Sequence, residues 1–371
     1  MYKSSEKFSS AIEKNGGRTF HPKLIFDGFE LETEIHSLSY NGGSNGEDNI
    51  TIGSAVSATL EIKMDKVPHL LTKQNFSFNL GILCEDGSYE FIPMGKFNAE
   101  KPETTDYEIN VTAYDNMVLA ERTYNSQLTY PTTTTAVMKE ICNAIGVSFA
   151  TEIESITINN PSSEEGASNS AFAGYTMREA IGYIAGLYGK FAIFNRLGQL
   201  EFRWYENSDY NVKLSKTYSF TKDEQDYSID QLIVLQNQET TFKAGSGVNG
   251  ISCSNPFATQ SIVDAIYQKI GGFTFRKGTV KFLGDCRIDP WDIISVEDLA
   301  GRTYKIPAMS ISHSVDGGLT TTIESFSNSN ADVSDAFSGP VTKAMERTYA
   351  QLLVVNKLIA DRVTADYVDA N

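Results

Sequence analysis

Apolar and polar residues alternate through residues 23–114 in the manner of β-strands. The apolar side chains that occupy every second position of one such run are Val56, Ala58, Leu60, Ile62 and Met64. This pattern is typical of a strand with one buried and one solvated face. Asp86-Gly87 lies between two further apolar runs and predicts a tight hairpin turn. Closely spaced strands of this kind favour a small barrel or sandwich.

Helical signals follow the first β region. The threonine run 132–135 offers an N-cap to the helix after it, and Gly146 ends that helix. Thr176 and Glu179 form a capping box for a second helix. A hairpin over residues 191–204 comes next, so this region predicts a compact helix-and-hairpin module.

The β pattern returns at about residue 218 and is interrupted by one helix. That helix covers residues 259–270 and ends at Gly271-Gly272, while Asp316-Gly317-Gly318 marks a later turn. The expected strands are residues 228–236, 239–244, 280–283, 291–296, 303–309 and 319–324. A second β-rich region is therefore expected after the helix-and-hairpin module.

The C-terminal part carries the seam of a short coiled coil, because apolar positions recur at alternating spacings of four and three. The seam residues, which we predict to form the oligomer interface, are Met345, Tyr349, Leu352, Asn356, Ile359 and Val363. A polar residue such as Asn356 in an apolar seam specifies register and strand number. The alternative is a helix that packs on its own domain. No Gly or Pro follows Val341, so we expect the helix to run to Asn371 and the product to continue in another version.

These patterns predict a mixed β and α+β fold in four parts. Two β-barrel-like domains, residues 1–121 and 218–333, bracket an α+β helix-and-hairpin module at residues 122–217. Residues 334–371 are expected to form a coiled-coil-like C-terminal α-helix that leads to an oligomer or a downstream region.

Composition narrows the class of protein. The 371 residues carry a net charge of -16, with 41% hydrophobic and 21% charged residues, which is typical of a soluble multidomain chain. No specific nucleic-acid surface is expected, because phosphate neutralisation needs clustered Lys and Arg. The acidic balance either gives solubility or lines a channel that repels DNA. No apolar run is long enough for a signal peptide or a membrane helix, so no membrane insertion is expected.

The residue types that most often carry chemistry are scattered. They are Cys84, Cys142, Cys253, Cys286, His21, His36, His69 and His313. The cysteines form no close pair and have no nearby histidine, so we expect buried thiols and neither zinc sites nor disulfides. The histidines lie in no metalloprotease or hydrolase motif. We therefore expect no catalytic residue, no metal and no cofactor.

Three stretches carry a family resemblance. They are Ile50-Thr-Ile-Gly-Ser-Ala-Val56 with the alternation after it, Pro93-Met-Gly-Lys-Phe97 leading to Val111-Thr-Ala-Tyr-Asp115, and Gly284-Asp285 with Asp289-Pro-Trp-Asp-Ile-Ile-Ser-Val296. In this order, over about residues 20–330, the chain resembles the hub proteins of phage tail tips and baseplates. That family includes tail-associated structural proteins and the N-terminal hub regions of tail-associated lysins and tail endopeptidases.

The resemblance implies a structural protein of the virion tail tip, assembled in the host cytoplasm. It implies a homotrimer in which two barrel-like domains per subunit alternate around a ring. Such a ring surrounds a DNA ejection channel and adapts the sixfold tail to a threefold tip. The implied partners are a distal tail ring or tail tube protein and a downstream fibre, spike, lysin or receptor-binding protein.

Two alternatives come from other classes of protein. Some relatives carry cell-wall hydrolase regions, so the first alternative is a tail endopeptidase, with lytic activity expected in a separate or downstream region. The second is a carbohydrate-binding module for the host envelope, in which Trp204 and Trp291 would stack on sugars. Isolated aromatic residues in strands more often fill cores, and we expect these two to pack inside.

Overall fold

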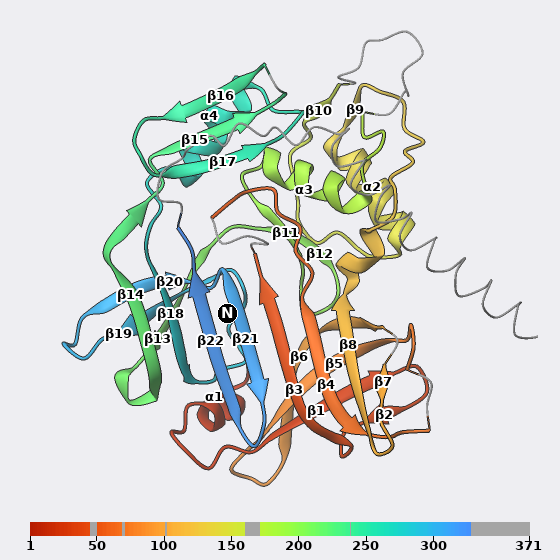
Figure 1. Cartoon of the computed structure of the whole chain (residues 1–371), viewed down its shortest axis with the longest axis vertical. Helices are drawn as coiled ribbons and strands as arrows, with labels where there is room; N and C mark the ends of the chain where they lie inside the picture. Colours follow the sequence, from red (N-terminus) through yellow and green to blue (C-terminus); the bar gives the residue numbers. More distant parts are fainter. Residues whose placement is uncertain (45–49, 69–70, 101, 160–170, 238, 328–371) are drawn as a thin grey trace, which may run out of the picture.

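The computed structural model describes residues 1–44, 50–68, 71–100, 102–159, 171–237 and 239–327 (Figure 1). Its α-helices are α1 (Glu6–Ile12), α2 (Thr134–Ile145), α3 (Met177–Leu187) and α4 (Gln260–Ile270). Two short 3₁₀ helices, η1 (Asn116–Ala120) and η2 (Leu214–Lys216), accompany them. The rest of the ordered backbone is mainly β, so the predicted mixture of β and α+β structure is confirmed.

One long sheet contains strands from both ends of the described chain. Its early strands are β1 (Phe20–Phe26), β2 (Glu30–Leu31), β3 (Ile35–Gly43), β4 (Thr59–Asp65), β5 (Asn75–Leu83), β6 (Tyr89–Ala99), β7 (Glu103–Thr104) and β8 (Glu108–Asp115). Its late strands are β14 (Thr217–Ser228), β18 (Thr274–Leu283), β21 (Ser310–Val315) and β22 (Leu319–Ser325). The 12-stranded sheet has the order β14-β18-β22-β21-β3-β4-β8-β6-β5-β1-β2, and β7 pairs with β8.

The expectation of two β-barrel-like domains is wrong. The sheet is open, with β14 at one end and β2 at the other. Between them β3 pairs antiparallel with β21, with Asn41 opposite Ser312, so the early and late strands share one sheet. Alternation along a strand reports which of its faces is buried, but it does not say which strand lies beside it.

The individual strands follow their sequence pattern closely. In β4 the side chains of Leu60, Ile62 and Met64 are buried, while Glu61 and Lys63 between them are exposed. The β5–β6 hairpin turns at the predicted Asp86-Gly87, where Gly87 has a φ of 80° that glycine adopts without strain. Burial of the apolar side chains on one face therefore stabilises these strands, as the alternation predicted.

The helix-and-hairpin region contains α2, α3 and four short strands. These strands are β9 (Thr132–Thr133), β10 (Thr157–Ile158), β11 (Phe191–Phe194) and β12 (Leu200–Arg203). Thr133 caps the start of α2, and Gly146 ends it in the left-handed conformation. The capping box of Thr176 and Glu179 is present at the start of α3. The predicted helix ends and hairpin are thus confirmed.

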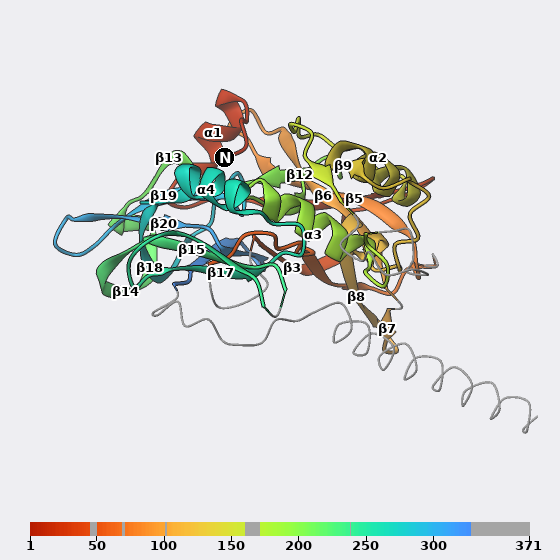
Figure 2. The same ribbon diagram turned by 90° about the horizontal axis from the view of Figure 1, so that it is seen from above.

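Two small sheets complete the fold. The first contains β15 (Gln231–Leu235), β16 (Thr241–Gly245) and β17 (Gly250–Ser254), and the second contains β13 (Glu206–Val212), β19 (Asp292–Glu297) and β20 (Thr303–Pro307). Helix α4 packs Val263, Ile266 and Ile270 into a core that it shares with β15. Figure 1 and Figure 2 show α2 on one flank of the molecule and the β19–β20 hairpin projecting from the opposite flank.

Candidate assembly surfaces

The coiled-coil seam predicted from the sequence lies outside the described residues. It comprises Met345, Tyr349, Leu352, Asn356, Ile359 and Val363. The seam therefore stays a prediction. The described residues offer other features, namely a buried polar junction and three surface features.

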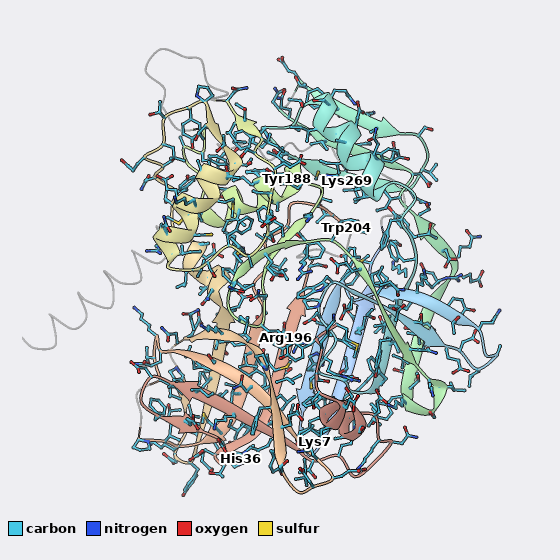
Figure 3. The ribbon with its side chains drawn as sticks, turned by 180° about the vertical axis from the view of Figure 1, so that it is seen from behind. Lys7, His36, Tyr188, Arg196, Trp204 and Lys269 are labelled. Carbon is cyan, nitrogen blue, oxygen red and sulfur yellow. The ribbon has the colours of Figure 1, made fainter. Side chains whose placement is uncertain are left out.

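Arg196 forms the centre of the buried junction. It lies in the turn between β11 and β12, and its Nε donates to Asp289 Oδ1 at 2.7 Å. Its two terminal nitrogens donate to the carbonyl oxygens of Pro93 at 3.0 Å and Cys286 at 2.8 Å. The ring of Tyr2 lies 5.1 Å from the guanidinium carbon. One cation thus connects the hairpin turn, β6, the loop before β19 and the N-terminal segment; Figure 3 labels it near the centre of the molecule.

Carboxylates in the loop before β19 and at the start of that strand complete the junction. The amino group of Met1 lies 2.5 Å from Asp292 Oδ1, and the backbone N–H of Asp289 donates to Asp292 Oδ2 at 2.7 Å. Burial and the neighbouring Asp289 raise the pKa of Asp292. Arg287 donates to both oxygens of Asp285. Asp289 and Asp292 belong to a stretch that carried the family resemblance, whereas nothing in the sequence around Arg196 singled it out.

Two histidines of the described chain each pair with one carboxylate, and a third is buried. His21 lies 3.0 Å from Glu32, and His36 lies 2.8 Å from Asp65. His313 is buried in β21 with its Nδ1 2.8 Å from Thr321 Oγ1, and burial lowers its pKa to about 3. Across the described ranges, no group of three or more His, Cys, Asp or Glu side chains could hold a metal ion.

The thiols are poor nucleophiles. Burial raises the pKa of Cys84, raises that of Cys142 to about 11, and raises those of Cys253 and Cys286 to about 12. A thiol with such a pKa is protonated at neutral pH, and the thiolate is the reactive form. The predicted buried position of Cys142 on α2 is confirmed.

The two tryptophans pack against other protein groups. Trp291 is buried, and the guanidinium carbon of Arg203 lies 5.0 Å from its ring centroid. Trp204 is half-buried, with the rings of Tyr205 and Phe273 at 5.0 Å and 5.8 Å. Both rings therefore pack against this chain's own side chains, and only Trp291 is buried as expected.

The tip of the β19–β20 hairpin is the first surface feature. The carboxylate of Asp298 accepts hydrogen bonds from the backbone N–H groups of Ala300 and Arg302 at 2.9 and 3.0 Å and from the Tyr304 hydroxyl at 3.0 Å. Gly301 has a φ of 74°, a conformation that suits glycine. Burial alone would raise the pKa of Asp298, but these donors hold it at about 2. Short-range contacts therefore stabilise the turn at the tip.

Leu299 stands at this tip and is 90% exposed. Close to the tip, Tyr304 packs against the neighbouring strands, with its ring centroid 4.4 Å from Lys222 Nζ and 4.8 Å from the guanidinium carbon of Arg276. These contacts tie β20 to β14 and β18. The hairpin thus presents a large apolar side chain to solvent.

A groove of about 680 Å³ beside α2 is the second surface feature. Its apolar lining includes the buried Cys142 and the half-buried Val147, Phe149 and Ile153. Its charged lining residues, Lys139 and Glu152, are exposed. An apolar floor with a polar rim is the usual form of a pocket that receives a side chain from a partner.

The outer edge of β14 is the third surface feature. Among the described strands it pairs only with β18, so its other edge is open. The register shifts between Lys222 and Asp226, and the exposed Asp223 and Glu224 lie at that irregularity. Bulges and charges on an edge strand oppose edge-to-edge pairing. This edge is therefore protected against indiscriminate association.

Three solved structures with the same fold are phage tail proteins. A tail protein from Neisseria meningitidis MC58 is 12% identical with a TM-score of 0.54, over 82% of this chain and 95% of that one. The 43 kDa tail protein of prophage MuSo2 from Shewanella oneidensis is 12% identical with a TM-score of 0.53, over 82% and 97%. Prophage tail protein gp18 from Listeria monocytogenes EGD-e is 9% identical with a TM-score of 0.50, over 88% and 99%.

The chain therefore has the fold of phage tail proteins, and the resemblance predicted from the sequence is confirmed at the level of fold. No protein-family profile matches the sequence. No curated protein matches it either. Within the described part of the chain, no helix is long and apolar enough to cross a membrane.

Proposed function

We propose that this chain is a non-enzymatic structural component of a phage tail or tail-like particle, placed at the tail tip or baseplate. The observation that carries the proposal is the shared fold, which extends over 82–88% of this chain and over 95% or more of each of the three tail proteins. The thiols have raised pKa values, and His21 and His36 each pair with a single carboxylate. These features support a structural role over nucleophilic catalysis.

Three copies would form a ring that adapts the sixfold tail to a threefold tip. A ring that transmits load between a tail tube and a fibre or spike needs a subunit whose parts keep a fixed relation. The open sheet that joins early and late strands, together with the Arg196 junction, supports this mechanical role. Its partners would be two further copies, a distal tail ring or tube protein, and a downstream fibre, spike or lysin.

The coiled-coil seam would join the three chains below the ring. Light scattering coupled to size exclusion tests this, with three chains of 40.9 kDa expected per particle. Leu352→Asp should weaken assembly, because it places a charge in an apolar seam. Gln351→Asp is the matched control, since the heptad spacing puts residue 351 off the seam. A wild-type protein that stays monomeric at every concentration would contradict the ring.

Location is tested separately on assembled particles. Antibodies against this chain, viewed by electron microscopy, should label the distal end of the tail. Labelling along the tail tube, or at the end that joins the capsid, would contradict the proposed place.

A further inference from the structure

A small cavity lies inside the Arg196 junction. It is lined in part by Tyr40 of β3, Met94 of β6 and Asp289, and it has a volume of about 20 Å³. Met94 and Asp289 are buried, and the Arg196 side chain is 11% exposed, so the cavity lies in the interior of the molecule. One water molecule needs about 10–15 Å³ of such space, whereas pockets for organic ligands measure about 300 Å³ or more. The size of the cavity therefore suits water.

Two residues of the lining have hydrogen-bonding capacity to spare. Among the described residues, the Tyr40 hydroxyl has no hydrogen-bond partner. Burial raises the pKa of Tyr40, so this hydroxyl stays protonated at neutral pH and can donate. Asp289 accepts from Arg196 through Oδ1, but its Oδ2 lies 3.7 Å from the Met1 amino nitrogen, which is beyond hydrogen-bond distance. The lining thus offers one spare donor and one spare acceptor.

The residue opposite Tyr40 in the sheet also has an unpaired polar atom. Strands β3 and β21 pair with Tyr40 opposite His313, and the two rings stack with their centroids 5.8 Å apart. His313 is 1% exposed, and its Nε2 atom has no hydrogen-bond partner within the described residues. A buried polar group that lacks a partner is costly, and in native proteins an internal water often satisfies such a group. Two unpaired polar groups side by side therefore mark this part of the fold as a place for water.

We propose that the cavity binds one ordered water molecule, which accepts a hydrogen bond from the Tyr40 hydroxyl and donates one to Asp289 Oδ2. Water fits both groups because it donates as well as accepts. The Asp289 carboxylate would repel an anion, and the Arg196 guanidinium would repel a cation. All five N–H groups of Arg196 are already directed at protein acceptors. The water links β3 to the loop before β19, and this inference does not depend on the proposed place of the chain in a tail.

A crystal structure of the full chain, at a resolution that shows ordered water, tests the site directly. The wild-type protein should have an electron-density peak within hydrogen-bond distance of both Tyr40 Oη and Asp289 Oδ2. Tyr40→Phe should lose the peak, because it removes the hydroxyl and keeps the ring that stacks on His313. Tyr89→Phe is the matched control and should keep the peak, since Tyr89 is 40% exposed and lies outside the cavity lining.

Magnetic relaxation dispersion of the solvent supplies a second readout, because it counts long-lived internal waters in solution. Tyr40→Phe should have one such water fewer than the wild-type protein, and Tyr89→Phe should have the same number. A wild-type cavity without density would overturn the proposal, even if Tyr40→Phe proved too unstable to study. A peak that stays unchanged in Tyr40→Phe, or equal numbers of long-lived waters in that variant and the wild type, would overturn it as well.

Discussion

The interior junction and the hairpin tip each rely on an aspartate paired with an arginine, but in different surroundings. The side chain of Arg196 is 11% exposed and lies 2.7 Å from Asp289, whereas that of Arg302 is 68% exposed and lies 3.0 Å from Asp298. Arg196 donates hydrogen bonds to acceptors in segments far apart in the sequence. Asp298 accepts hydrogen bonds from donors within six residues along the chain. The same chemistry therefore holds distant segments together in the interior and shapes one loop at the surface.

The largest effect is expected from Arg196→Met. This change leaves the buried carboxylate of Asp289 without its guanidinium partner, which costs about 3–5 kcal/mol of unfolding free energy in comparable buried pairs. Denaturant unfolding followed by fluorescence measures the loss. Arg302→Met is the matched control, and it should leave the free energy of unfolding within error, because exposed pairs contribute little. Equal losses in both variants would show that burial does not distinguish the two pairs.

A pH dependence sharpens the comparison, because buried carboxylates titrate differently from exposed ones. Asp115 is buried at the end of β8, and burial raises its pKa from 3.8 to about 6, despite hydrogen bonds from Ala58, Ser57 and Met117. Its contribution to stability is present below about pH 4 and is lost as pH rises through 6. Relative to Asp115→Asn, the wild-type protein should lose up to about 3 kcal/mol between pH 4 and pH 7.

His313 supplies the control of opposite sign. Its pKa is lowered from 6.5 to about 3, so its contribution is present above pH 6.5 and is lost as pH falls toward 3. Relative to His313→Gln, the wild-type protein should therefore become less stable as the solution is acidified. Unfolding curves at several pH values measure both differences. If the difference in unfolding free energy between wild type and variant changed with pH in the same direction at both positions, the assigned burial of one of these groups would be contradicted.

A close approach of backbones in the interior predicts a smaller effect. A Cβ added at Gly182 of α3 would lie 2.5 Å from the carbonyl oxygen of Gly53. Gly182→Ala should therefore cost about 1–3 kcal/mol, the usual range for overpacking. At the surface, a Cβ at Gly16 meets nothing within 4 Å, so Gly16→Ala should be neutral or slightly stabilising. Thermal unfolding compares the two variants, and a stable Gly182→Ala protein would mean that α3 shifts freely.

The smallest effect on global stability is expected from Asp298→Ala. The change removes four hydrogen bonds from the tip while leaving the cores untouched. Unfolding should be unaltered, whereas amide hydrogen exchange at Ala300 and Arg302 should speed up. Leu299→Ser is the control that keeps the Asp298 contacts, and it should leave exchange unchanged. Faster exchange in both variants would show that the leucine itself supports the tip.

Part of the hairpin tip could have been predicted from the sequence. Leu299 lies in the run Asp298-Leu-Ala-Gly301, whose Asp and Gly are typical of a surface turn. An apolar side chain inside such a turn is expected to be exposed. The groove beside α2 had no such signal, because its lining comes from a helix and from the separate segment that follows it. The seam around Leu352 was visible as a spacing and stays a prediction.

By itself, the sequence determined the elements whose signals lie within a few residues. Thr133 and Gly146 set the ends of α2, Thr176 with Glu179 starts α3, and Asp86-Gly87 turns a hairpin. Caps, turns and alternation act through neighbouring atoms, so the local sequence is enough to predict them.

Only the tertiary structure decided that β3 pairs with β21 and that Arg196 contacts three distant segments, namely β6, the loop before β19 and the N-terminal segment. These contacts depend on which partners the whole chain can bring together. Many strands satisfy the same alternation, and any arginine can donate to a carbonyl oxygen. The choice among such partners is made by the burial that the complete fold achieves, and no short stretch of sequence contains that information.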